Sequence, residues 1–254
     1  MLSVIFLVAC GVGRIVCAES DPQVVDLQLI LAVDVSESMS FAEKKIKRNG
    51  LADALRDPTV IAAITSGPLG RVAITYVEWA EFAYPALQWT LLDGPQTAER
   101  FAGQLERLWF HRERGTSISR ALSYASTLFD RSRFTSSRRT IDISGDGPNN
   151  VGPSVTEMRD KVVARGITIN GLPIVFEGSG SAGIDHNLFY RSCVIGGPGA
   201  FTMPVKSGEE LAGAIKVKLL REILVSQGDS LIVRTAAHKD LPPVDCTTGQ
   251  SGKN

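Results

Sequence analysis

Three oxygen-bearing side chains, Asp34, Ser36 and Ser38, follow an apolar run, residues 25–33, that has the pattern of a buried β-strand. Residues two apart in extended backbone point to the same side, so one carboxylate and two hydroxyls are aimed at a common point. Such oxygen ligands suit Mg²⁺ or Mn²⁺. The same residues can also cap a helix expected over residues 40–56, and this segment alone does not separate the two interpretations.

Two further segments bring oxygen ligands to comparable places. Thr116 lies in a Gly-Thr-Ser loop ahead of an expected helix, and Asp146 follows a strand expected over residues 139–144. In sheets of parallel strands, ligands bind beyond the carboxyl ends of the strands, where Asp34 and Asp146 both fall. The sequence therefore predicts one metal site assembled from three separated segments.

This order of motifs resembles the metal-ion-dependent adhesion site of the von Willebrand factor type A (vWA) family. Segment 30–39, Ile-Leu-Ala-Val-Asp-Val-Ser-Glu-Ser-Met, is similar to the signature of that family, and the likeness extends over residues 26–225. Segments 144–150 and 194–201 resemble an uncharacterised group of short exported bacterial vWA-like proteins. Carried over residue by residue, the resemblance implies these metal ligands: Asp34, Ser36, Ser38, Thr116 and Asp146.

In the vWA family the two aspartates often act through water, and an acidic side chain of a partner completes the metal's octahedron. The resemblance thus implies a protein-binding module that uses Mg²⁺, with Mn²⁺ as an alternative, and a protein ligand that presents Glu or Asp. The alternative from another class is an enzyme, a metal-dependent hydrolase that acts on a phosphoester through an activated water. Neutral hydroxyl ligands argue against it, because phosphoryl-transfer sites usually gather more carboxylates or a lysine; no catalytic residue is assigned.

Composition and charge narrow the class of protein. The 254 residues are 44% hydrophobic and 21% charged, which argues against disorder and allows one large domain. Lys and Arg number 27, as do Asp and Glu, so the basic excess typical of nucleic-acid binders is missing.

The first 18 residues have the pattern of a secretory signal peptide, an apolar run followed by Val-Cys-Ala. We therefore expect an exported protein, periplasmic or secreted, without a transmembrane segment in the mature chain. Leu-Val-Ala-Cys at residues 7–10 resembles a lipoprotein processing site, so lipid anchoring is the less favoured alternative. Cleavage would leave Cys193 and Cys246, which could pair in an oxidising compartment or remain free thiols.

Strand and helix patterns alternate along the chain, which predicts an α/β fold: a doubly wound, mainly parallel sheet with helices on both faces, as in vWA and Rossmann-like domains. Strands 71–79 and 82–90 are joined by a short link, so the second is expected to be an antiparallel edge strand. A further strand is expected over residues 200–205. The domain is expected over residues 24–225, with a loose tail over residues 226–254.

The helix expected over residues 40–56 has apolar residues that should face the core, Phe41, Ile46, Leu51 and Leu55. Its basic residues are expected to form the solvated face, with a protein-binding surface as the alternative: Lys44, Lys45, Lys47 and Arg48.

Five residues near the predicted site have roles that the sequence leaves open. Asp142 lies within a central strand, where a buried carboxylate needs a partner; it is either a structural hydrogen-bonding residue or a support for the metal site. Asn149 and Asn150 either line the site or make a turn. Arg112 and Arg114 flank Thr116 and are either solvated loop charges or a rim that attracts an acidic partner.

Overall fold

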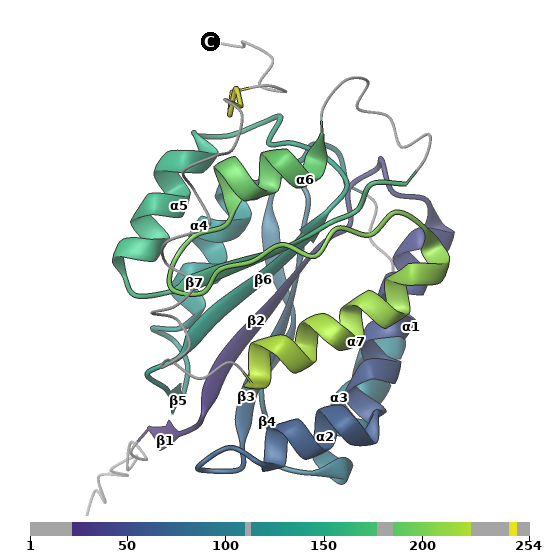
Figure 1. The fold of residues 1–254 in the computed structure, drawn as a ribbon, viewed down its shortest axis with the longest axis vertical. Helices are drawn as coiled ribbons and strands as arrows, with labels where there is room; N and C mark the ends of the chain where they lie inside the picture. Colours follow the sequence, from purple (N-terminus) through teal and green to yellow (C-terminus); the bar gives the residue numbers. More distant parts are fainter. Residues whose placement is uncertain (1–21, 110–112, 177–184, 225–243, 248–254) are drawn as a thin grey trace, which may run out of the picture.

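The computed structural model describes residues 22–109, 113–176, 185–224 and 244–247. Its centre is a five-stranded sheet in the order β4-β3-β2-β6-β7 (Figure 1). Only the pair β3 and β4 is antiparallel, so the predicted mainly parallel sheet with one antiparallel edge strand is confirmed. The strands are β2 (Leu27–Asp34), β3 (Val72–Trp79), β4 (Ala83–Leu92), β6 (Arg139–Gly145) and β7 (Thr168–Pro173). Two short strands, β1 (Gln23–Val24) and β5 (Phe134–Thr135), form a separate parallel pair.

Helices cover both faces of the sheet, as the alternating pattern predicts (Figure 1). The central strand β2 shows why: Leu29 and Leu31 belong to one apolar core, while Ile30 and Ala32 belong to the other. The first core is closed by α1 (Phe41–Arg56), α2 (Pro58–Thr65), α3 (Pro95–Glu106) and α7 (Gly208–Leu224). The second is closed by α4 (Ile118–Leu128), α5 (Val155–Ala164), α6 (His186–Phe189) and the π-helix η1 (Tyr190–Val194).

The strand expected over residues 200–205 is wrong as a continuous strand. This segment follows the edge of β7 and makes only isolated bridges, at Thr202 and at Val205. Met203 and Val205 donate their backbone N–H groups to the carbonyls of Gly171 and Pro173. Pro173 has no N–H to return to this segment, and the ladder is interrupted there.

The prediction for the two sides of α1 is wrong in part: Leu51 and Leu55 are buried and Lys45 is exposed as expected, but five other residues are reversed. Phe41 and Ile46 are exposed, whereas Lys44, Lys47 and Arg48 are buried. The basic side chains turn inward because they find buried acceptors. Lys47 and Lys44 donate to the backbone carbonyls of Asp34, at the end of β2, and of Val35, which follows it, and Arg48 pairs with Glu78 of β3 at 2.7 Å.

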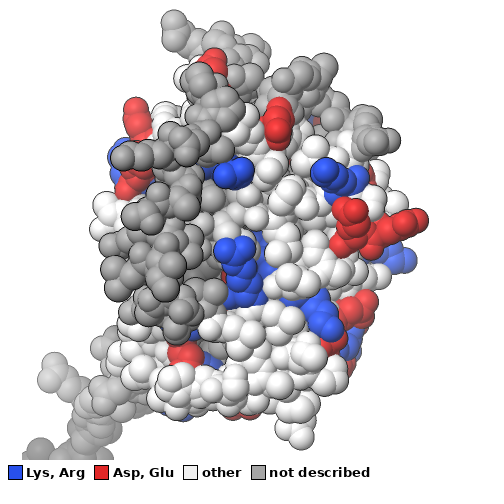
Figure 2. All heavy atoms as spheres, in the orientation of Figure 1, with Lys and Arg blue, Asp and Glu red and all other residues white. Residues whose placement is uncertain are grey.

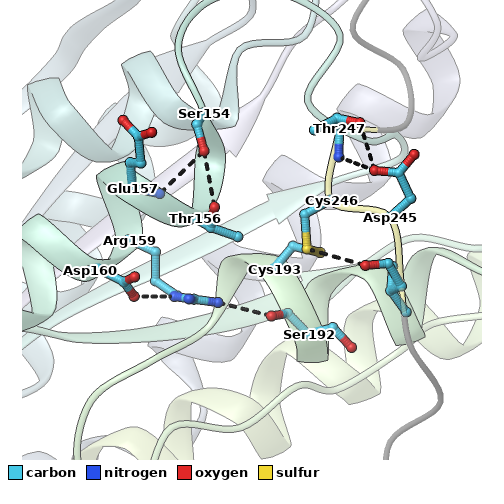
Figure 3. The surroundings of a disulfide bond; sticks show 11 residues. Ser154, Thr156, Glu157, Arg159, Asp160, Ser192, Cys193, Asp245, Cys246 and Thr247 are labelled. Carbon is cyan, nitrogen blue, oxygen red and sulfur yellow. Dashed lines mark hydrogen bonds and ion pairs between the residues drawn. A yellow bond between two sulfur atoms is a disulfide. The ribbon is translucent and has the colours of Figure 1, made fainter.

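Cys193 and Cys246 form a disulfide, the first of the two states that the sequence left open (Figure 3). Cys193 is buried in η1, and Cys246 packs against the same apolar core. Beside the bond, Arg159 of α5 donates to the backbone carbonyl of Ser192. Part of the expected loose tail is therefore attached to the domain, while the expected signal peptide and the rest of the tail lie outside the described residues.

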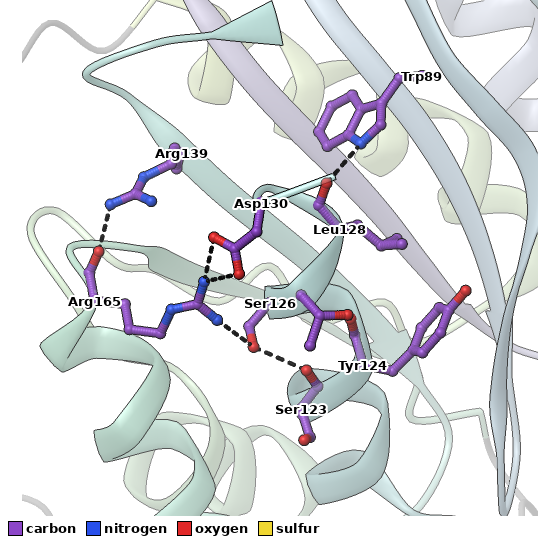
Figure 4. Close-up of polar contacts among 9 residues, drawn as sticks. Trp89, Ser123, Tyr124, Ser126, Leu128, Asp130, Arg139 and Arg165 are labelled. Atoms are coloured by element: carbon purple, nitrogen blue, oxygen red, sulfur yellow. Dashed lines mark hydrogen bonds and ion pairs between the residues drawn. The ribbon is translucent and has the colours of Figure 1, made fainter. Parts of the chain in front are cut away.

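Polar contacts fix the edge of the domain at which β6 begins (Figure 4). Arg165, which follows α5, donates to the carboxylate of Asp130 and to the hydroxyl of Ser126. Trp89 of β4 donates its indole N–H to the carbonyl of Leu128.

On the face shown in Figure 2, basic and acidic side chains are interspersed among uncharged ones. No helix in the described part of the chain combines the length and apolarity needed to cross a membrane.

Candidate functional site

The Asp-x-Ser-x-Ser loop meets Asp146 at the carboxyl edge of the sheet, where the neighbouring strands β2 and β6 end. The Ser36 and Ser38 hydroxyls lie 2.9 Å apart, and the Ser38 hydroxyl donates to Asp146 Oδ1 at 2.9 Å. Asp34 Oδ1 accepts the backbone N–H of Ser36 at 2.7 Å. The structure thus brings four of the five predicted ligands into one hydrogen-bonded chain.

The fifth predicted ligand, Thr116, lies in a loop that is tied to both of these segments. Glu113, at the start of that loop, forms an isolated bridge with Ser36. The backbone N–H of Thr116 donates to Asn150 Oδ1 at 2.8 Å, and the N–H of Asn150 returns to the Thr116 carbonyl at 2.9 Å. Asn149 accepts a further N–H, from the start of α4. The two asparagines therefore brace the loop after Asp146 against the Thr116 loop.

Helix capping does not explain the Asp-x-Ser-x-Ser segment. The N-cap of α1 is Ser40, which accepts the backbone N–H of Glu43, and the Glu43 carboxylate accepts the N–H of Ser40 in return. Because Ser40 caps α1, the side chains of Asp34, Ser36 and Ser38 are available for another role.

Asp34 carries the clearest electrostatic sign of a cation site. Its side chain is buried, and within the described residues Oδ2 has no hydrogen-bond partner. Burial raises the pKa of Asp34 to about 6, Lys47 opposes this, and the nearby Asp146 carboxylate adds to it. A buried carboxylate oxygen without a donor is costly, and a bound cation would remove that cost. The residues present therefore fit a divalent metal ion.

Gly145 leaves room for this carboxylate. A Cβ at residue 145 would lie 2.9 Å from Asp34 Oδ2 and 2.7 Å from the Tyr190 hydroxyl. The Tyr190 hydroxyl is itself buried and lacks a partner within the described residues. A glycine at the end of β6 thus allows a close approach that any side chain would block.

Two buried lysines beneath the site were missed by sequence reasoning. Lys47 Nζ donates to the Asp34 carbonyl at 3.0 Å and to Met39 Sδ at 3.2 Å, and Lys44 Nζ donates to the Val35 carbonyl at 2.6 Å. Their spacing could have revealed them: residues 44, 47, 48 and 51 lie on one face of a helix, and Leu51 on that face is apolar.

The rim of the site carries arginines in two environments. Arg114 is exposed and pairs with Glu37 of the Asp-x-Ser-x-Ser loop at 3.3 Å. Arg120 of α4 pairs with Glu81 at 2.8 Å and covers the exposed ring of Phe82. Arg112 lies outside the described residues.

Asp142 does not take part in the candidate site. It forms an ion pair of 2.6 Å with Lys218 of α7, and Lys218 also pairs with Glu222 at 2.5 Å. Asn170 donates to the same carboxylate of Glu222 at 3.0 Å. Of the two open roles, the structure thus gives Asp142 the structural one.

The ligand chemistry is mixed rather than carboxylate-rich. Across residues 22–109, 113–176, 185–224 and 244–247, no three His, Cys, Asp or Glu side chains gather as a metal-binding group. If the three hydroxyls bind a divalent ion directly and the two carboxylates act through water, the direct ligands leave the charge of the ion unneutralised, which favours an additional anionic ligand from outside.

Comparisons with known proteins agree with this fold. The model of the family described as "Protein of unknown function (DUF1194)" matches residues 24–227. No curated protein matches the sequence.

Several solved structures share the architecture. Proximal thread matrix protein 1 (PTMP1) from the mussel byssus, solved with a zinc-occupied MIDAS motif, has a TM-score of 0.56 and 14% identity, over 80% of this chain and 49% of that one. The pilus adhesin SpaC from Lactobacillus rhamnosus GG has a TM-score of 0.59 and 11% identity, over 80% and 31%. A von Willebrand factor type A protein from Catenulispora acidiphila has a TM-score of 0.50 and 14% identity, over 78% and 43%. The chain spans half or less of each of these proteins, and the likeness shows that it has the vWA fold.

Proposed function

We propose that this chain, which belongs to the family described as "Protein of unknown function (DUF1194)", is a protein-binding module with a metal-ion-dependent adhesion site. The observation that carries the proposal is the meeting of the Asp-x-Ser-x-Ser loop with Asp146 around a buried carboxylate oxygen of Asp34 that lacks a partner. The vWA fold supports it, since structures with this fold include a pilus adhesin and a matrix protein with a zinc-occupied MIDAS motif.

The proposed metal ion is Mg²⁺, with Mn²⁺ as the alternative, because hard oxygen ligands suit both. The residues that would hold it, directly or through water, are Asp34, Ser36, Ser38, Thr116 and Asp146. When bound, the ion supplies a Lewis acid that accepts one carboxylate oxygen of a partner protein.

The chain's own residues prepare this site for an acidic partner. In the metal-free arrangement the Ser36 and Ser38 hydroxyls and Asp146 satisfy one another by hydrogen bonds. The loop that bears Thr116 is already fixed by Asn150, so little ordering remains for the moment of binding. At the rim, Arg114 is exposed and paired with Glu37 of the Asp-x-Ser-x-Ser loop, so an acidic side chain of a partner could compete with Glu37 for this guanidinium.

We further propose that the protein is exported, with a signal peptide over residues 1–18 and a binding domain over residues 24–225 that works in the periplasm or outside the cell. The Cys193–Cys246 disulfide supports an oxidising compartment, because such bonds rarely persist in the cytosol.

Affinity capture from the native organism tests the proposed function. The immobilised wild-type protein and a Ser36→Ala, Ser38→Ala variant would be compared in Mg²⁺ and in EDTA. We expect a defined protein to be retained by the wild type in Mg²⁺ alone. Retention that depends on neither the cation nor the serines would contradict the proposal. If the wild type hydrolyses a phosphoester and Asp146→Ala does not, the protein is a hydrolase rather than a binding module.

A further inference from the structure

The side of α1 that faces the candidate site carries positive charge where the sequence pattern predicts solvent. Lys47 is only 3% exposed, and its Nζ reaches both ends of the Asp-x-Ser-x-Ser loop, at the Asp34 carbonyl and at Met39 Sδ. Lys44 lies one turn earlier and holds the Val35 carbonyl. Each lysine thus contacts a backbone carbonyl of this segment, and Lys47 also contacts the side chain of Met39.

We propose that Lys47 is a resident cation of the adhesion site: it stabilises the metal-free site and weakens metal binding, and after metal binding it leaves an excess of positive charge for an acidic partner. This inference rests on the proposed function, because it concerns the affinity of the same site for its metal ion.

The first argument is that the Lys47 ammonium has no carboxylate in direct contact. None of the ion pairs between described residues includes it, and its two contacts are a carbonyl oxygen and a thioether sulfur. A buried ammonium is costly unless nearby negative charge compensates it. Burial lowers the pKa of Lys47, and the carboxylates of Asp34 and Asp146 act in the opposite direction.

The second argument is that this compensation is mutual. The buried ammonium of Lys47 is held at the Asp34 carbonyl, 3.0 Å away, while Asp34 Oδ2 has no hydrogen-bond partner within the described residues, so the positive charge of Lys47 stabilises the negative charge of this carboxylate in the metal-free protein. Asp34, Asp146 and the Lys47 ammonium together carry one net negative charge for a divalent ion to meet, while Lys44 and Glu43 act on Lys47 in opposite directions. The loaded site then carries a net positive charge, which neutral hydroxyl ligands do not remove.

Calorimetric titration of the full mature chain with Mg²⁺ at pH 7.5 tests this inference. Lys47→Met removes the charge and the hydrogen bond, whereas Lys47→Gln removes the charge and keeps an amide donor. Lys45→Met is the matched control, because Lys45 lies on the same helix and is exposed. We expect both Lys47 variants to bind Mg²⁺ roughly tenfold or more tightly than wild type, since a unit charge so near a divalent ion is poorly screened. Lys45→Met should stay within about twofold of wild type, because exposed charges are well screened.

Thermal unfolding supplies a second readout that a purely structural role would not produce. In EDTA, Lys47→Met should melt below wild type, and its melting temperature should rise more on addition of Mg²⁺. If Lys47 only clamps the loop, both variants will instead bind Mg²⁺ as weakly as wild type or more weakly, and the inference is overturned.

The outcomes also separate this inference from the proposed function. If Asp34→Asn abolishes the Mg²⁺ binding of the wild type while the Lys47 variants bind Mg²⁺ as the wild type does, the adhesion site is supported and the role of Lys47 is overturned. Binding that is detected only in the Lys47 variants supports the role of Lys47. Absence of Mg²⁺ binding in every variant overturns both.

Discussion

Two buried clusters in this domain each combine two carboxylates with one lysine, and they are built differently. In the first, which we call the closed cluster, Lys218 of α7 lies 2.6 Å from Asp142 and 2.5 Å from Glu222. Lys218 and Glu222 are one helical turn apart, so the ammonium and its partner share a face. Asn170 adds a hydrogen bond to Glu222. The protein itself neutralises most of the charge in this cluster.

In the second, which we call the open cluster, the lysine does not reach the carboxylates. Lys47 donates to the backbone carbonyl of Asp34, while Oδ2 of the same residue has no partner within the described residues. The Asp146 carboxylate accepts a hydrogen bond from the Ser38 hydroxyl and not from an ammonium. Glu222 Oε2 of the closed cluster also lacks a hydrogen-bond partner within the described residues, but the Lys218 ammonium contacts both carboxylates of that cluster directly. The open cluster has no such direct contact with an ammonium, and this difference is the physical basis for placing a metal ion at the open cluster and none at the closed cluster.

The largest effect should come from breaking the closed cluster. Lys218→Met leaves Asp142 and Glu222 buried without their cation, so we expect a loss of about 3–5 kcal/mol in the free energy of unfolding. Denaturation in guanidinium chloride, with and without Mg²⁺, measures it. Mg²⁺ should not restore the loss; full restoration would contradict the distinction between the two clusters.

The pH dependence of stability also distinguishes the closed cluster from the open cluster. Burial, chiefly, raises the pKa of Glu222 from 4.5 to about 7, with a further contribution from Asp142. Since the folded state then holds this proton more tightly than the unfolded state, the free energy of unfolding should fall as pH rises from about 4.5 to 7, by about 3 kcal/mol.

Glu222→Gln should remove the contribution of Glu222 to that slope and leave the contribution of Asp34, whose pKa burial raises to about 6, as measured by urea denaturation at a series of pH values. This change in slope should be the same in Mg²⁺ and in EDTA, because the closed cluster has no metal. A profile that keeps its full slope in Glu222→Gln would show that another group carries it.

The open cluster should respond to metal, and its response should depend on Asp34. At a Mg²⁺ concentration 100-fold above the dissociation constant, binding adds about 2.7 kcal/mol, or roughly 5–10 °C in melting temperature. Asp34→Asn should abolish this rise. Asp142→Asn, the matched change in the closed cluster, should keep it. An equal rise in both variants would place the ion elsewhere.

Tyr190→Phe should have the smallest effect. Its hydroxyl makes no hydrogen bond to any described residue, so its removal should change the free energy of unfolding by less than about 1 kcal/mol. The rise in melting temperature with Mg²⁺ should persist. A loss of several kcal/mol would mean that this hydroxyl supports Asp34 directly.

The sheet and the segments that bear the candidate metal ligands could be predicted from the sequence. The alternating strand and helix patterns were sufficient for the sheet, because apolar periodicity reports which faces are buried. The ligand segments of the open cluster could be found because they follow strand ends. Pairing of Cys193 with Cys246 was left open, because sequence spacing alone does not place two sulfur atoms together.

The features that escaped prediction depend on tertiary partners. Lys44 and Lys47 were predicted to face solvent because the local sequence does not show that two buried backbone carbonyls accept hydrogen bonds from their ammonium groups. The partner of Asp142 comes from α7, far along the chain. The interrupted strand over residues 200–205 reflects a missing N–H on Pro173, a residue of the neighbouring strand rather than of the segment itself.

Anomalous scattering from crystals grown with Mn²⁺ tests the metal site most directly. The account predicts one peak at the carboxyl edge of the sheet, roughly 2.0–2.6 Å from the hydroxyl oxygens of Ser36 and Ser38, with Thr116, Asp34 and Asp146 around it directly or through water. A crystal in which that place stays empty at saturating Mn²⁺, or in which the ion lies at the closed cluster, would contradict it.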